Sequence, residues 1–375
     1  MMLRRSAASA GRAAGLRRRA APPAVRCAAS ATGAEPRAPR LDERKVLHAE
    51  IASMSKEEKR APRPENVEGS FFVDKTCIDC QTCRWMAPDT FSAVGLQAAV
   101  TKQPETREQR VAAMQALLSC PVYAIHTTQR DPQELKEAQA GLPRPWHTEA
   151  PGVYHCGWHS EASFGGAGWL IVRPGRGNVL VDSPRFSPAL VKQVEALGGV
   201  DYVFLTHKDD VADHAKWAAH FGAKRIIHEH EATAEQGTDA SEVKLAGEGP
   251  WPFPDGDEDL TIVYTPGHSD YHCVLFSARH KALFSGDHLC GVEADAAHWK
   301  LDSRLFIFED FNWFSVPEQL ESVRKLLDYD WLHVLPGHGP PVRVKDAAER
   351  LKAVGDLVAR HGTPVAAAPR IRPTR

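Results

Sequence analysis

The sequence predicts an α/β protein with two folded parts, a small module that contains clustered cysteines and a larger domain of alternating strands and helices. From about residue 150, short apolar runs typical of strands alternate with segments of helical periodicity. Groups of His and Asp directly follow several of these runs, and loops at strand ends are the usual place for a functional site. Four of the eight cysteines lie between positions 77 and 120.

The N-terminal segment differs from the rest of the chain. Residues 1–27 contain seven Arg and neither Asp nor Glu, a composition typical of an organelle transit peptide. We expect cleavage near Cys27, with the chloroplast stroma as destination and the mitochondrion as second choice. Loss of these seven Arg changes the formal charge from −2 to −9, which argues against nucleic-acid binding. Uninterrupted apolar runs long enough for a membrane span are absent from the sequence.

The small module is expected over residues 69–130. Residues 28–68 show no sustained apolar pattern and are interpreted as a linker, with a short helix near 41–52. Gly and Pro at 141–145 indicate a hinge over 131–149 between the two parts. Within the module we expect strands at 70–73 and 96–100 and a helix at 105–118, and we expect a further helix after it at 131–140.

The larger domain is expected over residues 150–365. Gly198 and Gly199 end one of its helices, and a capping-box pattern at 315–318 begins another. Strands are expected at 169–172, 179–181, 202–205, 225–228, 259–265, 272–277, 281–285 and 331–335, and helices at 187–197, 213–221, 316–327 and 344–359.

Three cysteines in a tight run, followed by a distant fourth, predict a metal cluster. Cys77, Cys80 and Cys83 are separated by two residues each, and Cys120-Pro121 follows after 36 further residues. Such spacing lets three thiolates surround one face of a cubane while the fourth closes it. The pattern resembles single-cluster bacterial-type ferredoxins, which implies a [4Fe–4S] cofactor; a structural zinc ion is the alternative.

A series of His and Asp residues points to a second metal centre. Residues 205–214 read LTHKDDVADH, and the later motifs TPGH, SGDH and LPGH end at positions 268, 288 and 338. Together they resemble the ligand series of the metallo-β-lactamase superfamily, including glyoxalase II-like and lactonase-like hydrolases. The resemblance implies a four-layer αβ/βα sandwich that binds one or two zinc, iron or manganese ions.

The resemblance assigns these residues to two ions. The first ion would be held by His207, Asp209 and His268, the second by Asp213, His214 and His338, and Asp287 would bridge them. Asp213 and Asp287 are also the expected catalytic residues. Asp209 stands where the family has His, and Asp210 competes with it as ligand. Carboxylate in place of imidazole moves the preference from zinc towards iron or manganese.

Three functions follow as hypotheses. The first is a hydrolase that attacks a small ester, thioester or lactone with metal-bound hydroxide. The second is an oxidoreductase whose non-haem iron centre receives electrons from the [4Fe–4S] cluster, with a ferredoxin or reductase as possible partner. The third is a non-catalytic redox sensor or assembly factor.

Overall fold

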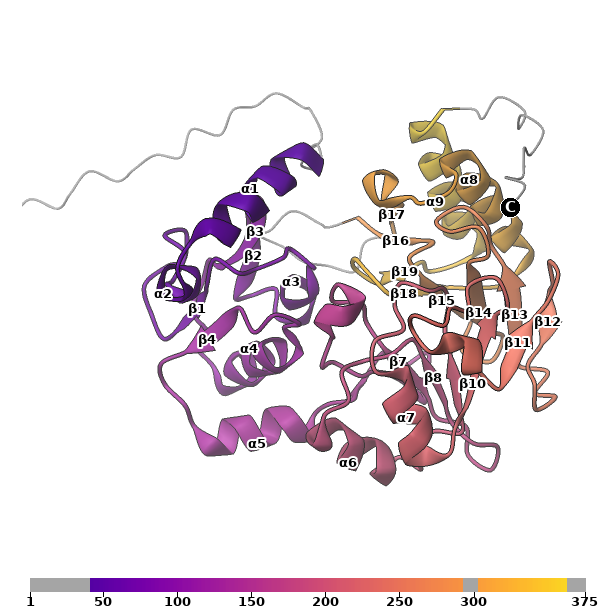
Figure 1. Cartoon of the computed structure of the whole chain (residues 1–375), viewed down its shortest axis with the longest axis horizontal. Helices are drawn as coiled ribbons and strands as arrows, with labels where there is room; N and C mark the ends of the chain where they lie inside the picture. The colour runs from indigo at the N-terminus through magenta and orange to yellow at the C-terminus, as the bar shows by residue number, and fades with distance from the viewer. Residues whose placement is uncertain (1–40, 293–302, 363–375) are drawn as a thin grey trace, which may run out of the picture. The chain divides into compact units, whose positions relative to one another are not determined.

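A small mixed module comes first along the chain (Figure 1). The computed structural model describes residues 41–292 and 303–362, all within one compact unit, Pro39–Arg375. The predicted transit peptide therefore lies outside the described residues. The first elements are α1 (Leu41–Ser53), α2 (Lys56–Arg60), β1 (Phe71–Val73), α3 (Thr82–Met86), β2 (Phe91–Val94), β3 (Gln97–Val100), α4 (Arg107–Ser119), β4 (Ile125–Thr127) and α5 (Pro132–Ala140). Antiparallel pairing joins β1 to β4 and β2 to β3.

The stretch expected to be a linker over 28–68 is folded where the structure describes it. Arg60 Nη1 donates to the carbonyl oxygens of Val122 (3.2 Å) and Tyr123 (3.0 Å). The Asn66 side chain bonds backbone groups of both β1 and β3. Polar side chains, not an apolar stripe, attach this stretch, which explains why periodicity did not reveal it. We call residues 56–140 the cysteine module.

Two sheets form the larger domain. Their strands are β5 (Arg144–Pro145), β6 (Val153–His155), β7 (Trp169–Ile171), β8 (Val179–Val181), β9 (Tyr202–Phe204), β10 (Lys224–His228), β11 (Val243–Leu245), β12 (Trp251–Pro252), β13 (Leu260–Tyr264), β14 (Cys273–Ser277), β15 (Ala282–Gly286), β18 (His333–Pro336) and β19 (Val342–Arg343). One sheet has the order β11-β10-β9-β8-β7-β6-β5, and the other has β12-β13-β14-β15-β18-β19. A short pair, β16 (Cys290–Gly291) with β17 (Leu305–Phe306), lies outside both sheets.

Helices cover the outer face of each sheet, which gives the four layers predicted. Side chains alternate along a strand, so Trp169 and Ile171 pack between the sheets while Leu170 faces the helices. The helices are α6 (Pro188–Ala196) and α7 (His214–Phe221) on the first sheet, and α8 (Val316–Lys325) and α9 (Ala347–Arg360) on the second (Figure 1). Among the described residues, no helix is long and apolar enough to cross a membrane.

The segment 131–149, expected to be a hinge, is instead packed. It supplies α5 and the edge strand β5 of the seven-stranded sheet. Leu142 is fully buried in an apolar cluster that includes residues of both the cysteine module and the larger domain. Arg185 Nη2 also donates to the carbonyl oxygen of Leu118 at 2.8 Å. The two parts therefore share one core across this segment.

Candidate functional site

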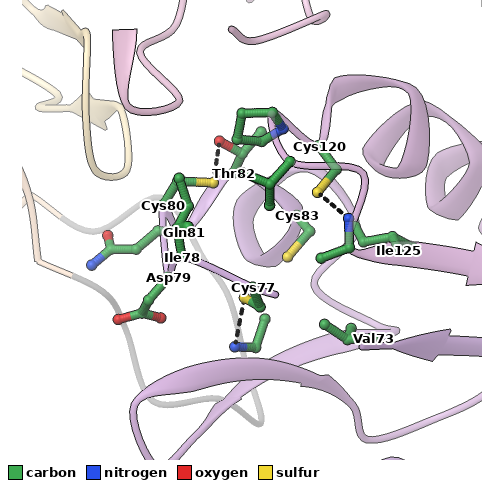
Figure 2. Close-up of a pocket in the computed structure, with 14 residues that line it drawn as sticks. Val73, Cys77, Ile78, Asp79, Cys80, Gln81, Thr82, Cys83, Cys120 and Ile125 are labelled. Carbon is green, nitrogen blue, oxygen red and sulfur yellow. Dashed lines mark hydrogen bonds between the residues drawn. The ribbon is translucent and has the colours of Figure 1, made fainter. Parts of the chain in front are cut away.

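Four cysteine sulfur atoms converge on one cavity of the cysteine module (Figure 2). Cys77 lies beyond β1, Cys80 and Cys83 flank the start of α3, and Cys120 ends α4. Burial, together with the neighbouring sulfur of Cys80, raises the pKa of Cys77 to about 11 and that of Cys120 to about 12. Metal binding would take these thiols as thiolates, so the crowded cavity fits a metal cluster.

Ion pairs hold the loop that carries the first three cysteines. Asp79 and Gln81 both have left-handed backbone conformations, with φ of 60° and 67°, which non-glycine residues adopt at an energetic cost. Asp79 Oδ2 accepts a 2.7 Å bond from Arg44 of α1, and Arg84 of α3 contacts the other carboxylate oxygen. These two guanidinium groups keep the loop in the shape that aims its sulfurs inward.

Backbone amides point at two of the sulfurs. Ala98 N lies 3.4 Å from Cys77 Sγ, and Ala124 N lies 3.2 Å from Cys120 Sγ. Such N–H···S bonds stabilise negative charge on the sulfur and are one means by which a protein tunes a cluster's potential. The cavity thus provides both ligands and electrostatic support.

A second cluster of potential ligands lies at strand ends of the larger domain. His207 Nε2 is 3.8 Å from Asp209 Oδ2 and 3.9 Å from Asp287 Oδ2. His268 Nε2 is 3.9 Å and 3.8 Å from the same two oxygens. Ligands held about 2.0–2.2 Å from one ion can be at most about 4.4 Å apart, so this group could share a cation. The structure thus brings together the three residues predicted for the first ion, with Asp287.

A buried threonine orients His207. Thr206 Oγ1 lies 2.9 Å from His207 Nδ1 and 3.0 Å from Asp182 Oδ1. If the hydroxyl donates to Asp182, its oxygen accepts the Nδ1 proton of His207, and the Nε2 lone pair faces the cluster. Burial lowers the pKa of His207, which favours the neutral, metal-binding form. Metal-binding His residues are commonly fixed through the other ring nitrogen in this way.

Asp210, Asp287 and His338 form a second three-ligand group that shares Asp287 with the first. His338 Nδ1 lies 2.7 Å from Asp287 Oδ1 and 3.6 Å from Asp210 Oδ2. Burial and the neighbouring Asp287 raise the pKa of Asp210 well above its usual range. Burial alone would lower the pKa of His338, but the two carboxylates raise it. A bound cation would relieve the repulsion between these buried carboxylates.

Asp213 and His214, predicted for the second ion, lie outside both groups. Asp213 Oδ2 accepts a 2.8 Å bond from the amide of Phe186, and His214 Nε2 lies 3.0 Å from the carbonyl oxygen of Gln236. Val211 is buried in the apolar core, so the chain turns there and directs the following residues away from the ligands. The structure therefore places Asp210, and not Asp213, beside Asp287 and His338, and Asp213 is not positioned for the ligand and catalytic roles that we predicted. The adjacent acidic pair at 209–210 was the signal for this.

The residues of both groups fit cation binding. Within the described chain, several buried side-chain atoms of these residues have no hydrogen-bond partner: His207 Nε2, Asp209 Oδ2, both carboxylate oxygens of Asp210, both ring nitrogens of His268, and His338 Nε2. Two glycines leave room beside the carboxylates. A Cβ atom built on Gly337 would lie 2.7 Å from Asp210 Oδ2, and one on Gly166 would lie 2.8 Å from it. Sequence reasoning did not identify the role of either glycine.

Another group of possible ligands, His147, Glu149 and His333, is better explained without a metal. The Trp146 indole can only donate, and its Nε1 lies 3.3 Å from His333 Nδ1, so the His333 proton sits on Nε2. Glu149 already forms a bidentate pair with Arg343, at 2.8 Å and 2.7 Å. The indole thus occupies the Nδ1 lone pair of His333, and Arg343 already neutralises the Glu149 carboxylate, so this group needs no shared ion.

Two consecutive glycines connect the cysteine cavity to the second three-ligand group. A Cβ atom built on Gly165 would lie 2.7 Å from Cys80 Cβ and 3.3 Å from its sulfur. A Cβ atom built on the next residue, Gly166, would lie 2.8 Å from Asp210 Oδ2. The 165–166 backbone therefore touches both sites.

Comparison with known proteins matches the two parts to two families. The model of the 4Fe–4S single cluster domain of ferredoxin I matches residues 73–127, and that of the metallo-beta-lactamase superfamily matches residues 164–338. A beta-lactamase-like protein 2 homolog of Caenorhabditis elegans is 30% identical over 83 residues, which span 22% of this chain and 23% of that protein.

Solved structures with similarity to the chain include a metallo-beta-lactamase from Pontibacter korlensis, with 20% identity and a TM-score of 0.37 over 51% of this chain and 87% of that one. A metallo-beta-lactamase from Erythrobacter litoralis has 14% identity and a TM-score of 0.36 over 51% and 81%. A third protein, in a di-iron-bound form, has 22% identity and a TM-score of 0.37 over 52% and 92%.

With its four-layer sandwich and strand-end ligands, the larger domain is a metallo-β-lactamase superfamily domain. The cysteine module that precedes it contains a single-cluster 4Fe–4S ferredoxin domain.

Proposed function

We propose that this protein is an oxidoreductase in which a non-haem iron centre in the metallo-β-lactamase domain works with the [4Fe–4S] cluster. The observation that carries the proposal is the 165–166 backbone, which touches Cys80 on one side and Asp210 on the other. Bound at these residues, the cluster would supply single electrons and the second centre would supply a redox-active metal.

The distance between the two sites supports this proposal. The Cβ positions built on Gly165 and Gly166 lie 3.3 Å from Cys80 Sγ and 2.8 Å from Asp210 Oδ2. Adding two Cα–Cβ bonds of about 1.5 Å and the ~3.8 Å spacing of consecutive Cα atoms gives an upper limit of about 13 Å between the sulfur and the carboxylate oxygen. Packed backbone fills this gap. Electrons tunnel directly between redox centres over such a separation.

The ligand set also favours iron. His207, His268 and Asp287 make a group of two His and one carboxylate, the donor set of non-haem iron(II) oxygenases. Asp209 and Asp210 add two more hard oxygen ligands nearby. Zinc sites of the superfamily would have imidazole at position 209, so the carboxylate is better explained by iron or manganese.

The proposed substrate is a small oxidised molecule such as dioxygen, nitric oxide or a peroxide. Reduction of a hydroperoxide, for example, consumes two electrons and two protons, breaks the O–O bond and leaves an alcohol and water. A reduced ferredoxin or a reductase would provide the electrons one at a time, and solvent the protons. We further propose that this takes place in the chloroplast stroma, to which residues 1–27 would direct the chain.

A metal-dependent hydrolase is the second candidate, because Asp287 belongs to both three-ligand groups. A carboxylate shared between two ions places them close enough to hold one hydroxide, the nucleophile of metallohydrolases. A small ester, thioester or lactone would then be the substrate.

Metal analysis of the full chain purified without oxygen separates the two candidates. The redox proposal predicts about six iron atoms per chain, four of them in the cluster, and no zinc. About four irons with zinc in the second centre would refute it and leave the hydrolase. Cys120→Ser serves as control, because it should remove the cluster's iron and sulfide and leave the other metal in place.

A further inference from the structure

A buried series of side chains leads from Cys80 into the metallo-β-lactamase domain. Cys80 Sγ lies 3.5 Å from Thr82 Oγ1, which lies 3.1 Å from His159 Nδ1. On the other side of the ring, His159 Nε2 lies 2.8 Å from His155 Nε2. Thr82, His159 and His155 are each at most 2% exposed, so solvent does not compete for these bonds.

One carbonyl group fixes the protons along this series. His159 Nδ1 lies 2.6 Å from the carbonyl oxygen of Gly165, which can only accept, so Nδ1 carries the proton. The same N–H also faces Thr82 Oγ1, and the threonine hydroxyl is therefore free to donate to the Cys80 sulfur. His159 Nε2 is then the acceptor for the Nε2 proton of His155.

Aromatic side chains pack around His155, the last residue of this series. The His155 ring stands edge-on to Trp85 at a centroid distance of 4.5 Å and is tilted on Trp169 at 5.2 Å. Trp169 Nε1 donates to the carbonyl oxygen of Pro336 at 2.9 Å, two residues before the ligand His338. The orientation of the Thr82 hydroxyl is thus set by residues of the larger domain.

We propose that Thr82 and His159 are positioning residues that raise the reduction potential of the cluster through the sulfur of Cys80. Reduction adds negative charge to the cluster and its sulfurs, and an O–H dipole aimed at one sulfur stabilises that charge. Removing the hydroxyl should make the cluster harder to reduce. The proposal depends on the cluster being bound and not on the identity of the other metal.

The test is a redox titration of the full chain, followed by the electron paramagnetic resonance signal of the reduced cluster. Thr82→Val removes the hydroxyl at nearly constant volume, and Thr82→Ser retains it. We expect Thr82→Val to lower the equilibrium constant for reduction about tenfold, roughly 59 mV for one electron, and Thr82→Ser to stay near the unmodified protein. Thr101→Val is the matched control, since Thr101 bonds Ser92 and does not line the cysteine cavity.

A second pair of variants tests His159. Asparagine can place an amide N–H close to the position of Nδ1, whereas phenylalanine cannot donate, so His159→Asn should keep the potential and His159→Phe should lower it. If Thr82→Val binds no cluster, the potentials of the two His159 variants test the proposal instead. The proposal is overturned if the cluster's reduction potential shifts no more in Thr82→Val than in Thr101→Val. It is also overturned if the two His159 variants have equal potentials. Because the potential is read at the cluster, zinc in the other domain would refute the proposed function and leave this result intact.

Discussion

Replacing Gly166 by alanine is expected to weaken cation binding at Asp210 without disturbing the cysteine cavity. The added Cβ atom would lie 2.8 Å from Asp210 Oδ2, 2.9 Å from its Cγ and 3.0 Å from Oδ1, whereas ordinary contact begins at 3.4 Å. The carboxylate must therefore withdraw by about half an ångström, and it has little space because Asp210 is only 1% exposed. Overpacking of this kind costs about 1–3 kcal/mol of stability.

Gly355→Ala is the matched control for this variant. Gly355 lies in the exposed face of α9, and nothing within 4 Å would meet its added Cβ atom. Alanine in a helix interior is favoured over glycine by about 1 kcal/mol, so this control should be slightly stabilised.

The assay is metal content after dialysis against graded chelator, with cluster iron and sulfide measured in parallel. Gly166→Ala should lose one ion per chain at a chelator concentration that leaves the unmodified protein and Gly355→Ala loaded, which corresponds to at least about tenfold weaker affinity. Cluster content should be unchanged. Equal metal retention by all three proteins would refute the assignment of Asp210 as a ligand.

Three other outcomes are expected. Asp213→Ala should lower the unfolding free energy by about 1–3 kcal/mol, because it leaves the Phe186 amide without its acceptor, while metal content stays unchanged; a lost ion would restore Asp213 as a ligand. Asp209→His should increase the share of zinc over iron after reconstitution in an equimolar mixture, and an unchanged ratio would contradict the ligand argument. Burial, helped by His147, lowers the pKa of His333 to about 4, so the unfolded chain binds its proton first as pH falls below about 6.5. Because of His333, the free energy of unfolding should fall by about 1 kcal/mol when the pH is lowered from 7.5 to 5.5. Urea unfolding of His333→Asn should show a smaller fall over the same pH range.

Much of the site followed from short motifs placed after apolar strands. His207, His268, Asp287 and His338 follow β9, β13, β15 and β18, so their meeting at one edge was expected once those strands were recognised. The cysteine spacing similarly predicted the cavity that the four sulfurs share.

The turn after β9 could not be predicted in the same way. Its ligand residues depend on where the chain bends between positions 208 and 214, and the burial of Val211 decides this. Asp213 bonds the Phe186 amide, a partner 27 residues earlier in the chain. Such a partner is invisible to local spacing, so the sequence alone does not predict that Asp210 joins the second three-ligand group.

The sequence by itself determined the two families, the ligand types and their order, because covalent spacing fixes which side chains can reach a common point from one loop. Only the tertiary structure decided which carboxylate serves the second group and how close that group lies to the cysteines. Both depend on contacts between segments far apart in the chain, where Gly165 and Gly166 meet Cys80 and Asp210. The packing at these two glycines is so close that neither position has room for a Cβ atom, and it brings the two sites together. Local sequence patterns do not encode such packing.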